Sequence, residues 1–196
     1  SDPNRGQWQN TTLSHNTVVI NEKAQDTGKY SGVPLHFDQK DTRVKVLDVD
    51  ASVVYATADE YRRTIVMVDY DDEISYGIDF FKVLGGNDHL YSFHAMSQQD
   101  PEVSENIKFK TQTTGTYANA AVAYGADPWV ASGNSGSVLK YPAGYTWMDD
   151  VKRANNPGTG EFYVDWKIKD SWNQSRNGKQ DIHLRMTMVN DWAASE

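Results

Sequence analysis

A histidine and an asparagine stand side by side at the start of a β-branched run in residues 13–25, LSHNTVVINEKAQ. A neutral imidazole binds metal ions and accepts protons, so His15 is the first candidate for chemistry in this chain. The chain contains no cysteine, which excludes disulfides and thiolate ligands. Any metal site must therefore use His, Asp or Glu side chains.

Another histidine, His36, precedes Asp38 by two positions in the segment LHFD. Residues with this spacing share one face of an extended strand, which would suit two ligands of a zinc ion. Two ligands do not form a site, however, and such a pair is commonly a surface hydrogen-bonding pair. His89 and His94 fall on opposite faces of their predicted strand, so they cannot chelate together. His183, in the last predicted strand, is expected to be an outward or edge residue.

Asp79 is a carboxylate within the otherwise aromatic and aliphatic segment YGIDFFKV. A carboxylate that faces inward must be paired, and Arg62 or Arg63 in the preceding strand is its natural cross-strand partner. We favour a structural ion pair between Asp79 and Arg63 over a catalytic acid. The chain has no nucleophile elbow, P-loop, dinucleotide-binding fingerprint or HExxH motif, so the sequence predicts no catalytic residue.

Apolar and polar residues alternate along most of the chain, which is typical of half-buried strands. The turn sequences YDDE (70–73), GGND (85–88) and RNGK (176–179) each join two such segments. Residues 115–160 are rich in Gly, Ala, Pro, Asn and Ser, and we expect loops there with one or two short strands or a helical turn around YTWMDDVKR. A single domain over residues 1–196, an all-β antiparallel β-sandwich with long loops and little helix, explains the pattern. Strands are expected at residues 17–21, 43–50, 52–58, 61–70, 75–85, 89–97, 106–113, 161–170 and 180–189.

The composition excludes several classes of protein. A hydrophobic share of 38%, an aromatic share of 12% and six tryptophans supply enough apolar area for a core, which excludes a disordered chain. The 19 basic and 27 acidic residues give a net charge of −8. Nucleic-acid binders need a basic face, so no nucleic-acid partner is expected. No apolar run approaches about 18 residues, the length of a membrane-spanning helix, so no membrane partner is expected either.

Several segments, taken in order, resemble the C-terminal β-sandwich of the heparinase II/III-like polysaccharide lyases. They are LSHNTVVINEKAQ, YRRTIVMVDYDDEISYGIDFFKVLGGNDHLYSFHA, and the late strands EFYVDWKIKD and IHLRMTMV. The resemblance covers most of residues 8–100 and 160–190 and little of 101–159. The chain departs from the family pattern in three places. Residues 20–23, INEK, follow the HNT element (His15–Thr17) where the family has a sequence like VDG; Leu90 replaces the usual acidic residue; and the basic position of the hairpin strand is Lys82. The resemblance therefore selects no substrate within the family.

This resemblance implies that His15 completes a zinc site whose other His and Asp ligands lie upstream, and that the chain is a fragment that lacks the first β-strands. It also implies an N-terminal (α/α) toroid in the same protein, which supplies most of the catalytic groups. Lyases of this family cleave uronic-acid polysaccharides by β-elimination, so the expected partner is an acidic polysaccharide, met in the periplasm or outside the cell. This chain is expected to form one wall of the substrate cleft and to brace the toroid. Alone, it is expected to be inactive and to bind no zinc tightly.

Aromatic residues in the loop region 115–160 are candidate platforms for sugar rings, and we expect this role of Trp129, Tyr145 and Trp147. Rings in loops are also ordinary covers of a sandwich core, and both interpretations stay open. Two other functions stay open for the whole chain. A carbohydrate-binding module that acts alone would need an exposed aromatic platform, and a structural or protein-interaction sandwich would carry a large apolar patch.

Overall fold

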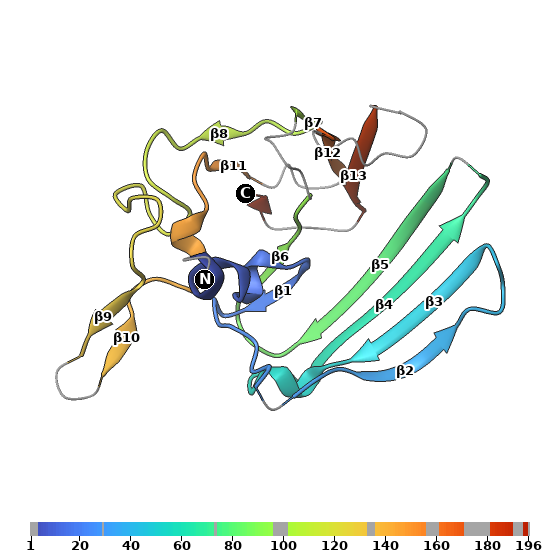
Figure 1. Ribbon diagram of the computed structural model, residues 1–196, viewed down its shortest axis with the longest axis horizontal. Coiled ribbons are helices and arrows are strands. Elements are labelled where there is room, and N and C mark those ends of the chain that lie inside the picture. The colour runs from blue at the N-terminus through green and yellow to red at the C-terminus, as the bar shows by residue number, and fades with distance from the viewer. Residues whose placement is uncertain are drawn as a thin grey trace. The chain divides into compact units, whose positions relative to one another are not determined.

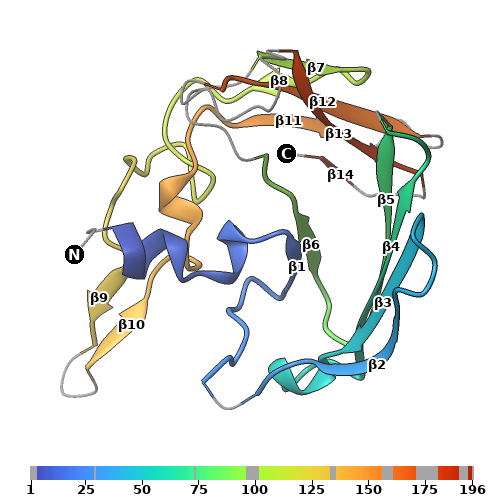
Figure 2. The ribbon, with the colours of Figure 1, turned by 45° about the vertical axis from the view of Figure 1, so that its right-hand side comes forward.

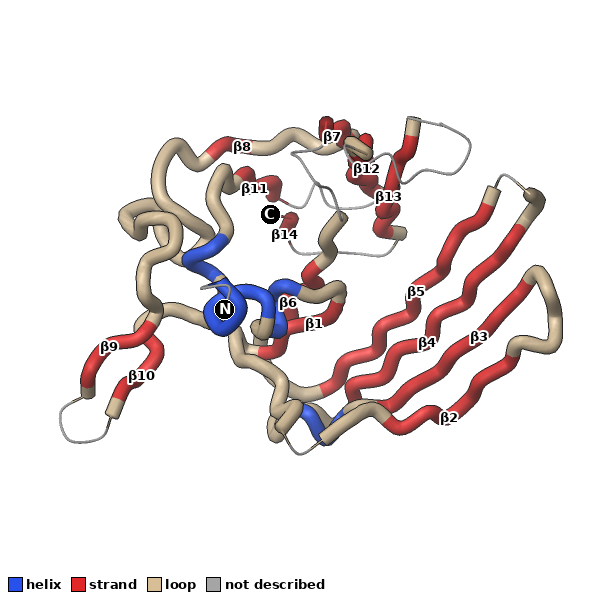
Figure 3. Tube along the Cα trace, viewed as in Figure 1, coloured by secondary structure: helices blue, strands red, loops and turns tan. Residues whose placement is uncertain are grey.

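The computed structural model describes residues 4–28, 30–72, 74–95, 102–132, 136–155, 161–170, 181–189 and 194–195. The chain divides into two compact units, Ser1–Ser92 and Phe93–Glu196. Each unit consists of antiparallel strands joined by loops and short helical turns (Figures 1 and 3). The chain is therefore all-β with long loops and little helix, which confirms the predicted fold class. That it forms a single domain stays a prediction.

In the first unit, four strands form one antiparallel sheet in the order β2-β3-β4-β5, and β1 pairs with β6 (Figures 1 and 2). The strands are β1 (Thr17–Ile20), β2 (Val33–Asp38), β3 (Val44–Asp50), β4 (Glu60–Asp69), β5 (Ser75–Leu84) and β6 (His89–Ser92). Short helical turns accompany them at η1 (Arg5–Gln9), η2 (Thr12–Ser14) and η3 (Ser52–Val54).

The core of this unit lies where the β1–β6 pair packs on one end of the larger sheet. Val18 and Ile20 of β1 belong to one buried cluster with Tyr61 of β4, and Phe81 of β5 packs against this cluster. The rings of Tyr61 and Phe81 meet edge to face, with their centroids 4.8 Å apart. Strand alternation turns these side chains to one face, so two sheets enclose one apolar layer in a sandwich-like arrangement.

The GGND turn joins β5 to β6, as the sequence predicts. Gly85 has a φ of 87°, and a Cβ atom at this position would lie 2.3 Å from a backbone carbonyl oxygen, so the turn requires glycine. The side chain of Asn21, at the end of β1, accepts hydrogen bonds from the backbone N–H groups of Asn87 at 2.8 Å and Asp88 at 3.1 Å. These bonds tie the β1 end to the turn.

One predicted strand is absent from this unit. Residues 52–58 form the turn η3 and a loop instead. The carboxylate of Asp50 accepts hydrogen bonds from the backbone N–H of Ser52 at 3.2 Å and from its hydroxyl at 2.8 Å. Such local bonds compete with strand pairing, which explains why the alternation here misleads. The sheet gains β2 instead, a strand that the alternation does not predict.

The second unit contains two three-stranded sheets and one hairpin. The first sheet has the order β13-β12-β7, with β7 (Glu102–Glu105), β12 (Phe162–Ile168) and β13 (Ile182–Met188). The second has the order β14-β11-β8, with β8 (Lys110–Thr111), β11 (Lys152–Asn155) and β14 (Ala194–Ser195). The hairpin consists of β9 (Trp129–Ala131) and β10 (Ser137–Leu139), and the helical turn η5 (Tyr145–Trp147) follows it.

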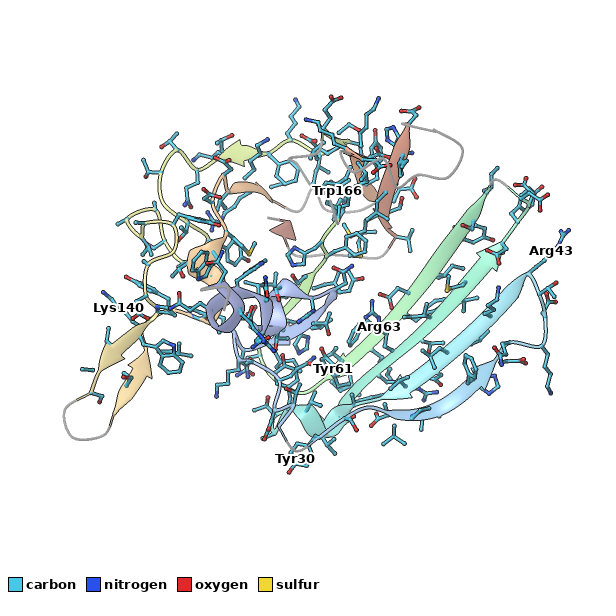
Figure 4. All side chains as sticks on the ribbon, in the orientation of Figure 1. Tyr30, Arg43, Tyr61, Arg63, Lys140 and Trp166 are labelled. Atoms are coloured by element: carbon cyan, nitrogen blue, oxygen red, sulfur yellow. The ribbon has the colours of Figure 1, made fainter. Side chains whose placement is uncertain are left out.

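The sheet of β12 and β13 has one polar and one apolar face, as its alternation predicts. Trp166 lies on the apolar face, and its ring centroid is 5.7 Å from that of Phe93 (Figure 4 labels Trp166). The predicted turn RNGK (176–179) lies outside the described residues. Within the described part of the chain, no helix has the length and apolar character needed to cross a membrane.

Candidate functional site

Arg63 of β4 and Asp79 of β5 form a bidentate ion pair between the two strands. Arg63 Nε donates to Asp79 Oδ1 at 2.9 Å, and Arg63 Nη2 donates to Asp79 Oδ2 at 2.7 Å. The two residues are diagonal neighbours on one face, because Arg63 is opposite Phe81 in the strand register. Both side chains are about a quarter exposed, so water screens this pair only in part.

The same guanidinium also holds the HNT element. Arg63 Nη1 donates a hydrogen bond of 2.8 Å to the carbonyl oxygen of Asn16, the residue after His15. Arg63 therefore connects the start of β1 to β4 and β5 (Figure 4). The hydroxyl of Tyr91 donates to Asp79 Oδ2 at 2.8 Å, which adds β6 to the cluster.

Tyr91 is a hydrogen-bond donor in this cluster and not a base. Burial raises its pKa well above the ordinary value, and the adjacent Asp79 carboxylate raises that pKa further. A general base must lose its proton near the working pH. The arrangement therefore keeps Tyr91 protonated and fixes the orientation of Asp79.

A second network ties the HNT element to the core through Tyr61. The Tyr61 hydroxyl donates to the carbonyl oxygen of Val18 at 2.5 Å and accepts from the Gln25 side-chain amide at 2.8 Å. It also lies 2.7 Å from the Thr17 hydroxyl. Burial raises the pKa of Tyr61, so the phenol stays neutral. Thr17, Val18 and Gln25 all belong to LSHNTVVINEKAQ, so this one phenol links three positions of the segment.

His15 lies at the exposed end of this arrangement. It follows η2, and its backbone N–H donates to the carbonyl oxygen of Thr12 at 3.2 Å. Among the described residues, no group of three or more His, Cys, Asp or Glu side chains could hold a metal ion. His15 can offer one imidazole to a zinc ion, and the described residues do not build the remaining sphere. The zinc site, with its ligands upstream, stays a prediction.

The remaining histidines of the first unit have structural surroundings. His36 lies on β2 opposite Asp48, and the carboxylate of Asp38 accepts a hydrogen bond from the backbone N–H of Lys40 at 2.9 Å. His89 Nε2 lies 2.7 Å from the carbonyl oxygen of Gly85, within the β5–β6 turn. None of these groups is part of the Arg63 cluster.

The three predicted sugar-contact rings have different exposures. Trp129 on β9 is 49% exposed, whereas Tyr145 in η5 is 6% exposed. Tyr145 packs edge to face on Tyr117, with centroids 4.8 Å apart, and half-buried Trp147 meets Tyr124 in the same way at 5.3 Å. Tyr145 and Trp147 thus share one turn, and Trp129 stands on the hairpin. Of the three predicted rings, Trp129 presents the most surface to a sugar.

The sequence analysis missed a polar cluster on β12 and β13. Asp165 is only 5% exposed, and its carboxylate accepts hydrogen bonds from His183 Nδ1 at 2.5 Å and Arg185 Nε at 2.9 Å. His183 Nε2 lies 3.2 Å from Asp181 Oδ1. The hydrogen bond to Asp165, and then that to Asp181, raises the pKa of His183. The His183 bond likewise lowers the pKa of Asp165.

The sequence contains residues that predict this cluster, but they can be matched only when the register of β12 and β13 is known. Asp165 lies opposite Arg185, and Lys167 lies opposite His183, so all four share one face. The segments EFYVDWKIKD and QDIHLRMTMV carry this match only after they are aligned antiparallel. Considered alone, His183 indicates no more than an outward or edge residue, and β13 is indeed the edge strand of its sheet.

Comparison with models of known protein families found none that matches this chain. A search of curated proteins also found no matching sequence. The resemblance to heparinase II/III-like lyases therefore depends on the quoted motifs alone, and it stays a prediction.

Proposed function

We propose that this chain is the C-terminal β-sandwich portion of a uronic-acid polysaccharide lyase. In this proposal it forms one wall of the substrate cleft and braces an N-terminal (α/α) toroid. The observation that carries the proposal is the Arg63 cluster. It joins, by hydrogen bonds, the HNT element before β1, the arginine of β4, the carboxylate of β5 and the tyrosine of β6.

These residues come from the segments that carry the family resemblance. The segments are far apart in sequence, yet their polar residues meet in one cluster in the first unit. Arg63 and Asp79 meet because β4 pairs with β5, and the bond from Arg63 to Asn16 adds the HNT element to this contact. This joint placement of the motif residues is what the proposal expects, and it supports the proposal.

The proposed reaction is β-elimination at a uronate. A base removes the proton on C5, next to the carboxylate, and the glycosidic oxygen leaves from C4, which produces an unsaturated uronate. This needs neutralisation of the carboxylate, a base, and an acid for the leaving oxygen. We assign none of these roles to this chain, because the catalytic motifs of the family do not occur in its sequence, and the raised pKa of Tyr91 keeps that residue from acting as the base. The toroid would supply them.

The roles proposed for this chain are those of support and contact. Arg63 and Tyr61 fix the HNT element, so that His15 can offer its imidazole to a zinc ion whose other ligands lie upstream. Zinc in such a site would stabilise the join between this chain and the preceding strands. Of the three predicted rings, Trp129 is the most exposed and is the one proposed to contact a sugar. The parent protein would act in the periplasm or outside the cell on an acidic polysaccharide.

A second candidate function is a carbohydrate-binding module that acts alone. Two exposed rings of the second unit favour it, Trp129 at 49% and Tyr124 at 57% exposure. Exposed rings of this kind offer flat apolar faces for sugars. This function requires measurable affinity of the isolated chain for a glycan.

Ultraviolet absorbance of the unsaturated uronate tests the proposal. The assay is run on this chain and on the longer reading frame that contains it, against heparan sulfate, alginate, hyaluronan and chondroitin. Product from the longer frame but not from this chain supports the proposal and names the substrate. If neither makes product, and the isolated chain binds one of these glycans in a way that Trp129→Ala abolishes, the stand-alone module is favoured.

A further inference from the structure

The four-stranded sheet of the first unit has two edges, β2 and β5, and they differ in how well they are protected (Figure 3). Strand β2 carries Pro34, which has no N–H group to offer a further strand. Its register with β3 also shifts between Pro34 and His36. Proline and such irregularities are the usual devices that prevent an edge strand from pairing with another chain. The β2 edge is therefore protected.

Strand β5 has neither device. It pairs with β4 without interruption from Ser75 to Leu84 and contains no proline. Among the described strands it is hydrogen-bonded on one side only, to β4. Apart from the Asp79 side chain, which is about a quarter exposed, the residues from Ser75 to Phe80 are exposed. A long, regular edge strand with outward N–H and C=O groups is a template for a further strand.

The charges on β5 do not protect it either. Asp79 is paired with Arg63 and accepts the Tyr91 hydroxyl, and Lys82 pairs with Glu60 at 2.7 Å. Each charge of the strand is thus balanced within its own unit. Three exposed apolar residues lie between and before them: Tyr76 is 51% exposed, Ile78 40% and Phe80 60%.

We infer that β5 is the interface through which two copies of this chain pair, antiparallel about a two-fold axis at Ile78. The alternation of β5 places Tyr76, Ile78 and Phe80 on one face of the sheet. With the axis at Ile78, the two Ile78 side chains meet, and each Tyr76 lies opposite Phe80 of the second copy. Aromatic and β-branched cross-strand pairs are the ones that stabilise a sheet.

The charge pattern selects this register over its neighbours. An axis at Asp79 would place two carboxylates opposite each other, which is unfavourable. An axis at Phe80 would place Ile78 against the ammonium-bearing Lys82 of the second copy. An axis at Gly77 would shorten the overlap and put two glycines at the centre, where no side chains pack. With the axis at Ile78, Asp79 faces Gly77, and no like charges meet.

The pairing would create one continuous eight-stranded sheet and would satisfy the outward backbone groups of β5 in both copies. The residues that would pair all belong to the first unit, and the inference does not rest on the proposed lyase function. A lyase fragment and a stand-alone module could each dimerise in this way.

Light scattering after gel filtration tests the inference over a range of chain concentrations. The wild-type chain should have twice the mass of one chain. Ile78→Lys, which opposes two cations at the axis, should have the mass of a single chain. Leu35→Lys is the matched control, because Leu35 is a 52% exposed apolar residue of the protected β2 edge; this variant should stay dimeric. Far-ultraviolet circular dichroism checks that all three are folded.

A wild-type chain that stays monomeric overturns the inference, and so does a folded Ile78→Lys variant that stays dimeric. Single cysteines then test the register, since the chain has no cysteine of its own. Under mild oxidation Ile78→Cys should form a covalent dimer, because its two copies face each other. Phe80→Cys should not, because it faces Tyr76. Cross-linking at Phe80, or at neither position, overturns the register.

Discussion

Arg63 donates a hydrogen bond of 2.8 Å to the carbonyl oxygen of Asn16, forty-seven positions earlier in the chain. The same guanidinium holds Asp79 in two bonds. Because one planar guanidinium bonds to both Asp79 and the Asn16 carbonyl, the orientation of the HNT element depends on the sheet that carries Arg63. Lysine could not reproduce this geometry, since its ammonium is a point charge.

Arg63→Gln should lower the free energy of unfolding by about 1–3 kcal/mol, because it leaves the partly buried Asp79 carboxylate and the Asn16 carbonyl without their donor. Urea unfolding measures the change. Arg43→Gln is the control, since Arg43 is exposed at the other end of the sheet, and it should change the stability by less than about 0.5 kcal/mol. Equal urea midpoints for the two variants would contradict the role of Arg63.

Tyr61→Phe should destabilise the chain by about 1–2 kcal/mol, because the Val18 carbonyl and the Gln25 amide lose a buried partner. Thermal unfolding compares this variant with Tyr70→Phe, which alters a residue that is 64% exposed. The control should unfold with the wild type. If Tyr61→Phe did so too, the hydroxyl network would contribute nothing to holding the HNT segment.

The Asp165–His183 contact should make stability depend on pH. The folded pKa of His183 lies above its unfolded value of 6.5, so this contribution is complete below about pH 6.5 and is lost as the pH rises through the folded pKa. The folded pKa of Asp165 lies below 3.8, so its contribution is present above that value and is lost as the pH falls through the folded pKa.

Melting temperatures from pH 5 to pH 9 test this sign. The wild type should lose stability relative to His183→Gln as the pH rises above about 6.5, because the variant has no proton to lose at this position. Nuclear magnetic resonance titration of the His183 ring should show the raised pKa directly. If the melting temperatures of the two proteins changed in parallel across this pH range, the result would contradict a stabilising Asp165–His183 pair.

Replacement of His15, made in the longer protein that the proposed function implies, tests whether this residue binds zinc. His15→Ala should reduce zinc affinity by at least about tenfold, since even changes to residues behind a metal ligand cost that much. His36→Ala is the control, because His36 lies on β2 apart from the HNT element, and it should leave the zinc content unchanged. Zinc bound equally by both variants would remove His15 from the site.

The parts of the fold that depend on alternation could be predicted from the sequence. Strands β4, β5, β12 and β13 follow it closely, and the diagonal contact of Arg63 with Asp79 follows from the pairing of β4 with β5. Residues 52–58 could not be predicted in this way, because local bonds between Asp50 and Ser52 override the alternation. The Asp165–His183 contact required the β12–β13 register, which the separate segments do not specify.

The burial of individual aromatic rings could not be predicted from the sequence either. Tyr145 and Trp129 occur in the same loop-rich region, and nothing in their neighbours distinguishes a core ring from an exposed one. Tyr145 is covered because its turn packs against the segment of Tyr117, whereas Trp129 lies on a short hairpin. Only the three-dimensional contacts separate these two environments.

The most direct test of the proposed lyase function is mass spectrometry of the products that the longer reading frame makes from a uronic-acid polysaccharide in heavy-oxygen water. Elimination breaks the glycosidic bond without adding water, so the account predicts that each cleavage leaves one product with an unsaturated uronate end. Products that have a saturated end at every cleaved bond and carry heavy oxygen would show hydrolysis. That result, or the absence of any product from all four polysaccharides, would contradict the account.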